Sequence, residues 1–147
     1  MPDTTNPYPL PKFHFQVQWG GTKVNFTEVT GLEVSADVIE YRDGASPEFH
    51  KIKMPGMQKF SNITLKRGKF EKDNDFYVWW STIQMNKIER RDLIVTLLNE
   101  NHVPVFTWNI KNAFPVKVNA GDLGADKNEV MIESMELAHE GLTMTAN

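Results

Sequence analysis

The sequence predicts a mainly β domain, either a barrel or a sandwich, with a single helix. Short segments in which apolar and polar residues alternate recur along the chain, and turn residues separate them. One segment has helical spacing instead. The 147-residue chain is long enough to bury a core without staples. It contains no cysteine, so disulfides and thiolate metal sites are excluded.

The strands can be assigned in order along the chain. Residues 12–19 alternate between apolar and polar side chains, so one face of this strand is expected in the core. Gly20-Gly21 predicts a hairpin that returns as a strand over 22–29, and residues 30–41 continue in an extended conformation. The remaining predicted strands are 61–68, 92–99, 103–110, 114–120 and 129–137.

Residues 72–85 change to the helical period, and Asp73 or Asn74 can cap the first turn. The apolar face of this predicted helix consists of Phe76, Trp79, Trp80 and Ile83. We interpret the aromatic face as core packing rather than as a platform for a ligand. The tryptophans expected to pack in the core are Trp79, Trp80 and Trp108.

Several predicted strands are apolar on both faces. In the segment 92–99, the two faces carry Leu93, Val95 and Leu97 on one side and Ile94 and Leu98 on the other. A strand that is apolar on both sides needs cover on both sides, and one short helix covers only part of a sheet. The remaining cover comes either from a second sheet of the same chain or from another subunit. We infer that neighbouring subunits cover part of the apolar surface of each protomer.

Residues 38–57 predict a hairpin with a turn near Gly44 to Pro47, yet few of its side chains suit a core. Acidic residues lie mostly on its first arm and basic residues mostly on its second. An isolated two-stranded hairpin is marginally stable in water. We therefore expect this hairpin to lie against another surface, and its mixed charges favour the polar surface of a partner.

Motifs for catalysis or cofactor binding are absent from the sequence. There is no GxGxxG segment, no phosphate-binding loop and no GxSxG segment. The four histidines, His14, His50, His102 and His139, do not have the spacing of zinc ligands. The net charge of −3 does not suggest a basic nucleic-acid binder. We therefore expect no enzyme activity, no metal and no cofactor.

We interpret the individual charged residues as structural. Lys66 and Arg67 are expected to be solvated or to lie in an interface. Glu133 lies in an apolar strand, so we expect either a cationic partner across an interface or a position that faces solvent or a wet channel. The acidic, glycine-rich segment 119–129 lacks the spacing of an EF-hand loop, and we interpret it as a surface loop rather than a calcium site.

A series of segments, in order, resembles the tail-tube protein family. These are the inner-tube proteins of contractile phage tails and of phage-tail-like injection systems, and the similarity runs from about residue 12 to 143. The segments are FHFQVQWGG, TGLE, VIEYRDG, KMPG, NITLKRG, DFYVWW, VTLLNE, WNIKNAFPVKV, NEV and ELAHEGL. The most specific of them are NITLKRG, WNIKNAFPVKV and ELAHEGL at these intervals.

The resemblance implies a small β-barrel of two packed antiparallel sheets, with one flanking α-helix and an extended β-hairpin arm. It implies a single tail-tube domain over 12–147, and residues 1–11 are expected to form a flexible N-terminal arm. Six copies would form a ring, and rings would stack into a hollow tube inside a contractile sheath. The hairpin arm would contact neighbouring subunits through Glu40, Tyr41, Arg42, Asp43, Gly44, Pro47, Glu48, His50 and Lys51.

The partners that the resemblance implies are further copies of the chain, the contractile sheath protein, baseplate and tube-terminating proteins, and DNA or protein effectors as cargo in the lumen. Residues 1–11 carry four prolines and no apolar run, so we expect no signal peptide, and the sequence contains no apolar run of membrane-spanning length. We expect synthesis in the cytoplasm and assembly in a phage tail or a phage-tail-like particle. Two alternatives remain open: a tube-initiator ring protein of the baseplate and, from another class, a β-barrel that binds a small ligand.

Overall fold

The computed structural model describes residues 14–21, 25–42, 44, 52–83, 87–126 and 129–147, and the chain is mainly β, as predicted. The predicted N-terminal arm, residues 1–11, lies outside the described residues. The elements are β1 (Phe15–Gln18), β2 (Glu28–Thr30), β3 (Val34–Tyr41), β4 (Ile52–Phe60), β5 (Ile63–Gly68), α1 (Asp75–Trp80), β6 (Arg91–Leu98), β7 (Pro104–Asn119), β8 (Ile132–Ala138) and β9 (Gly141–Ala146). In this part of the chain, no helix is long and apolar enough to cross a membrane.

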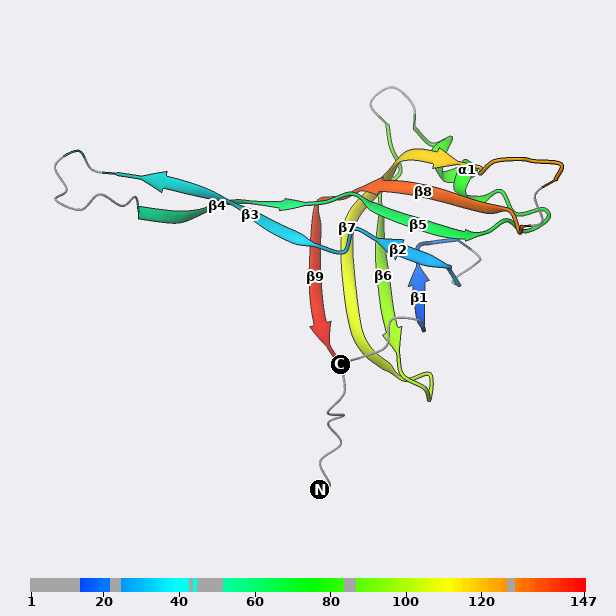
Figure 1. The fold of residues 1–147 in the computed structure, drawn as a ribbon, viewed down its shortest axis with the longest axis horizontal. Helices are drawn as coiled ribbons and strands as arrows, with labels where there is room; N and C mark the ends of the chain where they lie inside the picture. Colours follow the sequence, from blue (N-terminus) through cyan, green and yellow to red (C-terminus); the bar gives the residue numbers. More distant parts are fainter. Residues whose placement is uncertain (1–13, 22–24, 43, 45–51, 84–86, 127–128) are drawn as a thin grey trace, which may run out of the picture.

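Seven strands form one antiparallel sheet that bends into two packed halves (Figure 1). The β6 half has the order β9-β7-β6-β1. The β8 half has the order β7-β8-β5-β2. β1 and β2 stand at opposite ends of the pairing order, and no pairing joins them within the described residues. The expected two layers are therefore present, but the barrel is open on this side.

β7 belongs to both halves and turns the corner between them. The sequence predicts separate strands over 103–110 and 114–120, whereas the structure has one strand of 16 residues. Asn112 adopts a positive φ of 54°, which Asn tolerates better than most residues. Its backbone N–H donates to Asp92 Oδ1 (3.0 Å), and its side-chain amide donates to Glu140 Oε2 (2.8 Å). The polar break in the sequence is thus a bend within a strand.

Gly20 and Gly21 do not form the predicted hairpin, because β1 pairs with β6 while β2 pairs with β5. Residues 22–24 of the predicted second strand lie outside the described residues. A Cβ atom added to Gly21 would lie only 2.1 Å from the ring of Trp19. The missing side chain therefore allows the backbone to pass closely over a buried tryptophan on its way to the other half.

The core lies between the two halves and beneath α1. Its buried residues are Val17, Trp19, Phe26, Ile63, Leu65, Phe76, Trp79, Leu93, Val95, Ile110, Ala113, Met135, Leu137 and Leu142. Trp79 is fully buried, and its indole N–H donates to the carbonyl oxygen of Glu89 (2.8 Å). Trp80 is half-buried, and Trp108 is partly buried and packs against the core. The helix is shorter than the predicted 72–85, whose last two residues lie outside the described residues.

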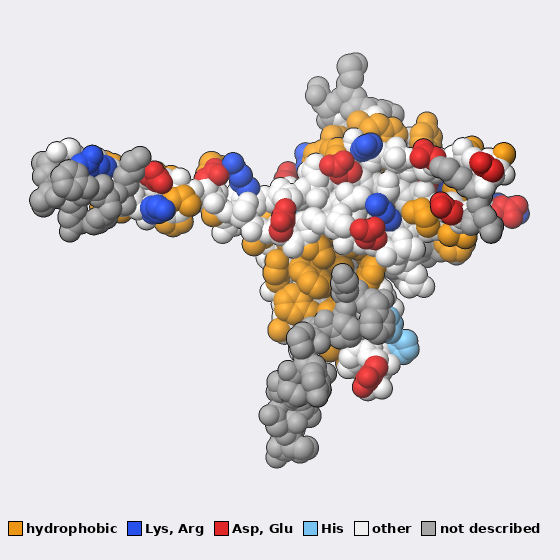
Figure 2. Space-filling model, in the orientation of Figure 1, with side chains coloured by type: hydrophobic (Ala, Val, Ile, Leu, Met, Phe, Trp, Pro, Cys, Tyr) orange, Lys and Arg blue, Asp and Glu red, His pale blue; other side chains and the backbone are white. Residues whose placement is uncertain are grey.

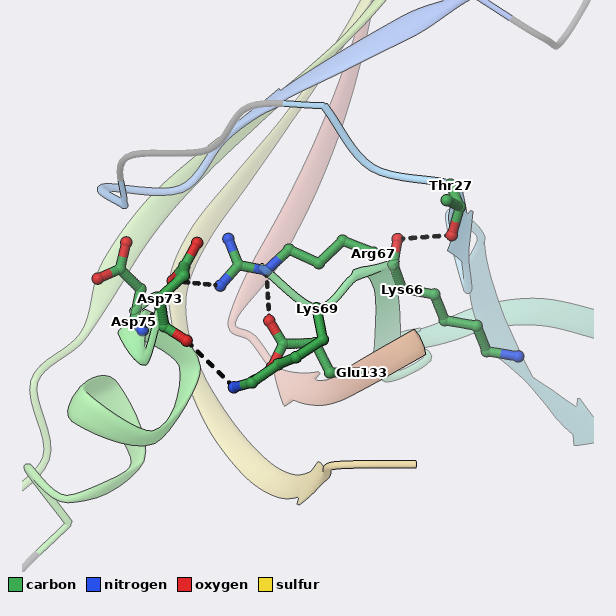
Figure 3. Close-up of polar contacts among 7 residues, drawn as sticks. All are labelled: Thr27, Lys66, Arg67, Lys69, Asp73, Asp75 and Glu133. Atoms are coloured by element: carbon green, nitrogen blue, oxygen red, sulfur yellow. Dashed lines mark hydrogen bonds and ion pairs between the residues drawn. The ribbon is translucent and has the colours of Figure 1, made fainter. Parts of the chain in front are cut away.

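A buried ion cluster centred on Arg67 interrupts this apolar core (Figure 3). Nε of Arg67 donates to Oε1 of Glu133 (2.6 Å), and Nη2 donates to Oδ1 of Asp73 (3.0 Å). Nζ of Lys69 lies 3.1 Å from the other oxygen of Glu133. The expectations that Arg67 is solvated or interfacial, and that Glu133 pairs across an interface or faces water, are therefore wrong. Both side chains are buried and paired within one subunit.

Aromatic rings surround the buried guanidinium. The central carbon of the Arg67 guanidinium lies 4.2 Å from the ring centre of Phe76, 5.2 Å from that of Trp19 and 5.9 Å from that of Phe26. A cation over aromatic faces is attracted by the ring quadrupoles, more strongly where water is excluded. Trp19 directly follows β1, Phe26 precedes β2 and Phe76 lies in α1. Together with the ion pair to Glu133 of β8, these contacts join both halves and the helix.

Trp79→Ala should destabilise the subunit by about 3–5 kcal/mol, because it removes a fully buried indole and leaves a cavity. Trp80→Ala is the matched control, and it should cost clearly less because Trp80 is only half-buried. Urea unfolding of both variants, followed by far-UV circular dichroism, measures the difference. Equal losses for the two variants would contradict this assignment of the buried face.

Arg67→Met should cost about 3–5 kcal/mol, because it leaves the buried carboxylates of Glu133 and Asp73 without their main cation. Lys66→Met provides the control from the adjacent position, where the side chain is 44% exposed. It should change stability by no more than about 0.5 kcal/mol. The same unfolding measurement decides, and a fully stable Arg67→Met protein would rule out a structural role for the cluster.

Candidate functional site

The hairpin of β3 and β4 projects far from the body of the subunit and exposes apolar side chains (Figures 1 and 2). Ile39 pairs with Met54, and Tyr41 pairs with Ile52. Directly opposed residues of an antiparallel pair lie on the same face. These four side chains, between 43% and 57% exposed, therefore form one apolar patch, which we call the arm patch.

The opposite face of the same hairpin has a different chemistry. Glu40 stands opposite Lys53 in the register, and Val38 stands opposite Pro55. Nearer the body, on the face of the arm patch, Lys59 forms an ion pair with Asp37 at 2.9 Å. Each face thus carries both apolar and charged side chains, and the arm patch differs in that its two neighbouring pairs are apolar and exposed. Exposed apolar side chains that lie together indicate a protein interaction surface.

The structure places only part of the predicted interface. Glu40, Tyr41, Arg42 and Gly44 lie on the hairpin and are exposed. The other predicted interface residues, Asp43, Pro47, Glu48, His50 and Lys51, lie outside the described residues. The prediction emphasised the charges and missed Ile39, Ile52 and Met54. Their alternation with Glu40, Arg42 and Lys53 is the signal that could have identified them.

An apolar groove of about 820 Å³ lies on the open side of the two halves. Phe15, Leu97 and Trp108 line it from the β6 half, and Phe26, Val29 and Leu32 line it from β2 and its flanking segments. We call it the open groove. It exists because the strands of the β6 half extend beyond the cover that the β8 half provides (Figure 1).

The apolar surface continues from the open groove toward β9. Phe106 and Trp108 are in contact, with ring centres 4.8 Å apart. Met144 stands opposite Trp108 in the register and is 46% exposed. Figure 2 shows the corresponding hydrophobic area below the root of the hairpin. A contiguous exposed apolar area of this kind indicates a protein interaction surface.

The other face of the β6 half is mostly polar and uncharged. Register places Gln16, Thr96, Thr107 and Thr145 in one row across the four strands. The next row consists of Gln18, Ile94, Asn109 and Thr143. No other described strand covers this face, and among the described strands β1 and β9 each pair on one side only. The β6 half thus has two free edges and one polar face.

The described residues do not bring a catalytic constellation together. They contain no group of three or more His, Cys, Asp or Glu side chains that could hold a metal ion. The carboxylates of Glu133 and Asp73 both face buried or half-buried cations in the core rather than an opening. The surfaces available for function are therefore the arm patch, the open groove, the free edges and the polar face.

Comparison with solved structures gives close matches over nearly the whole chain. A chain in the sheath–tube complex of an extracellular contractile injection system, PVC, in its extended state is 34% identical, with a TM-score of 0.88. That match covers 96% of this chain and 94% of the other. A chain in the tube-terminating cap of the anti-feeding prophage is 35% identical, with a TM-score of 0.89, and the match covers 99% and 96% of the two chains.

A more distant structure shares only the fold. Hcp1 from Flavobacterium johnsoniae is 15% identical, with a TM-score of 0.57, and the match covers 92% of this chain and 97% of the other. Among curated protein sequences, none matches. The family profile described as T4-like virus tail tube protein gp19 matches residues 11–143. Because this match spans most of the sequence, the chain belongs to the T4-like tail tube protein family.

Proposed function

We propose that this chain is the tube-forming subunit of a contractile phage tail or phage-tail-like injection particle. Copies form six-membered rings, and the rings stack into a hollow tube that carries DNA or protein effectors. The observation that carries this proposal is the β6 half, with two free edge strands, one apolar face and one polar face. The role is mechanical, and no bond chemistry is required of any residue.

The two free edges can join neighbouring subunits into one continuous sheet. Each neighbouring pair in the order β9-β7-β6-β1 is antiparallel. β9 and β1 therefore run in opposite directions, and β9 of one copy can pair with β1 of the next without breaking the alternation. Closing the ring in this way removes exposed edges that would otherwise pair without control.

The polar face then lines the channel. The apolar face of the β6 half carries the β8 half and α1, which are too bulky to fit inside a ring closed by single strands. The rows of threonine, glutamine and asparagine therefore face the water-filled lumen. The side chains of these two rows carry no charge, whereas Lys111, opposite Gly141 in the register, adds a positive charge to the next row of the same face.

The arm patch of one copy covers the open groove of another. The hairpin points away from its own groove, so it cannot fill that groove within one subunit (Figure 1). Both surfaces are apolar and exposed in the single chain, and burying them together would remove both from water. We thus propose an apolar contact for the hairpin, in place of the polar contact that its charge pattern predicts.

The partners follow from the assembly. The similar chains come from a sheath–tube complex and from a tube-terminating cap. By analogy, the outer surface of this tube meets a contractile sheath, and its ends meet a baseplate and a terminating cap. The chain is made in the cytoplasm and assembled into a phage tail or phage-tail-like particle.

Met144→Pro should prevent tube formation while the subunit stays folded. Asn147 donates its N–H to Val105 on the adjacent strand, so by alternation the N–H of Met144 points away from β7, toward the free edge. Proline removes that donor from the edge. Met144→Ala keeps the donor and also removes most of the methionine side chain, so it should still form tubes. Negative-stain electron microscopy beside circular dichroism tests the pair, and normal tubes from Met144→Pro would contradict edge pairing.

Replacing Ile39 and Met54 together by threonine should weaken or abolish tubes, because both side chains belong to the arm patch. Replacing Glu40 and Lys53 by threonine alters the opposite face of the same hairpin and serves as the control. Threonine suits a strand in both cases. Sedimentation of the assembled fraction at low and high salt measures the effect. Loss of tubes only in the Glu40 and Lys53 variant would restore the polar-contact hypothesis.

A further inference from the structure

We propose that His14 and His102 form a binding site for a divalent transition-metal ion, Cu²⁺ or Ni²⁺. Nε2 of His14 and Nδ1 of His102 lie 3.0 Å apart, although 88 positions separate the two residues in the sequence. Their rings meet edge to face, with centres 4.6 Å apart. The spacing in the sequence gave no sign of this pair, because the strand pairing of β1 with β6 brings it together.

The distance between the two nitrogens suits a chelated ion. Two imidazole nitrogens that bind one ion at about 2.1 Å and at a right angle stand about 3.0 Å apart. Tetrahedral ligands at the same bond length stand about 3.4 Å apart. In the metal-free protein, 3.0 Å is the distance of a hydrogen bond between the two rings, so a bound ion would displace the shared proton. The two nitrogens already lie near the separation of a right-angle chelate, a geometry that Cu²⁺ and Ni²⁺ accept.

The backbone holds both histidines in place before an ion arrives. His102 adopts a positive φ of 60° in the turn between β6 and β7, and its N–H donates to the carbonyl of Asn99. The side chain of Asn99 accepts from the N–H groups of Asn101 and Val103. The carbonyl of His14 accepts from the N–H of Leu98. A preformed pair of this kind loses little conformational freedom on binding.

The site is open to solvent. His102 is exposed and His14 is half-buried. Histidine side chains are visible on the surface at this end of the body (Figure 2). Because the described residues offer no third His, Cys, Asp or Glu ligand there, the remaining positions of the ion are filled by water.

Metal binding would fasten the start of β1 to the turn that follows β6. β1 is a four-residue edge strand with one partner strand, so an added bridge at His14 should reduce its fraying. An ion bound to the folded state alone also raises the unfolding temperature. This inference stands on the pair itself and does not depend on the proposed tube.

The test is a titration of untagged, chelator-treated protein with Cu²⁺ and, separately, Ni²⁺ at about pH 7.5, where free imidazole is mostly neutral. Isothermal calorimetry should give one ion per chain. His14→Gln and His102→Asn should each weaken binding by at least about tenfold, because the second ligand of the chelate is lost. Asn tolerates the positive φ of position 102. His139→Gln, which changes a histidine elsewhere, should leave the affinity unchanged.

Electron paramagnetic resonance of the Cu²⁺ complex provides the second readout. The hyperfine pattern should show two imidazole nitrogens in the unaltered protein and one in each single variant, while circular dichroism verifies that all variants are folded. Folded His14→Gln and His102→Asn proteins that bind as tightly as the unaltered chain would overturn the proposal. Equal weakening by His139→Gln, or a pattern with one nitrogen from the start, would overturn it too.

Discussion

The buried guanidinium of Arg67 is the interaction on which the rest of the subunit depends. It lies inside an aromatic shell of Trp19, Phe26 and Phe76, and it joins β5 to β8 through Glu133 and to the approach of α1 through Asp73. A buried ion pair adds little net stability over an apolar core, but it tolerates few alternative arrangements. We infer that its contribution is to fix how the helix and the two halves sit together.

With that core fixed, the described residues leave apolar surface uncovered at the arm patch and at the open groove, among other places. Neither can be covered by the other within one subunit, because the hairpin points away from the body. A subunit of this shape is incomplete alone, and family membership supplies the reason. The same apolar residues that would make a monomer prone to aggregation become contacts between copies in an ordered assembly.

The mainly β class, the position of the helix and most strands could be predicted, because alternation reports a buried face directly. The pairing could not. Gly20-Gly21 looks like a hairpin turn, but the close approach to Trp19 depends on a contact that local sequence does not encode. β9 carries only Leu142 and Met144 as large apolar residues, so its sequence has no strong apolar–polar alternation.

Arg67 and Glu133 resemble surface charges in the sequence, because they become partners only when β5 and β8 pair. The arm patch is present in the sequence as an alternation of apolar and polar residues, but the charged residues that alternate with it predict a polar contact instead.

The bend at Asn112 has a mechanical consequence. Because β7 is one uninterrupted strand, its first part lies in the channel wall and its second part lies in the outer layer of the proposed tube. Thrust from a contracting sheath on the outer layer would reach the wall through covalent bonds, in parallel with the packing between the layers. Shear between the two layers would then load the backbone of β7 and the hydrogen bonds of Asn112. The channel wall and the outer layer would therefore move together.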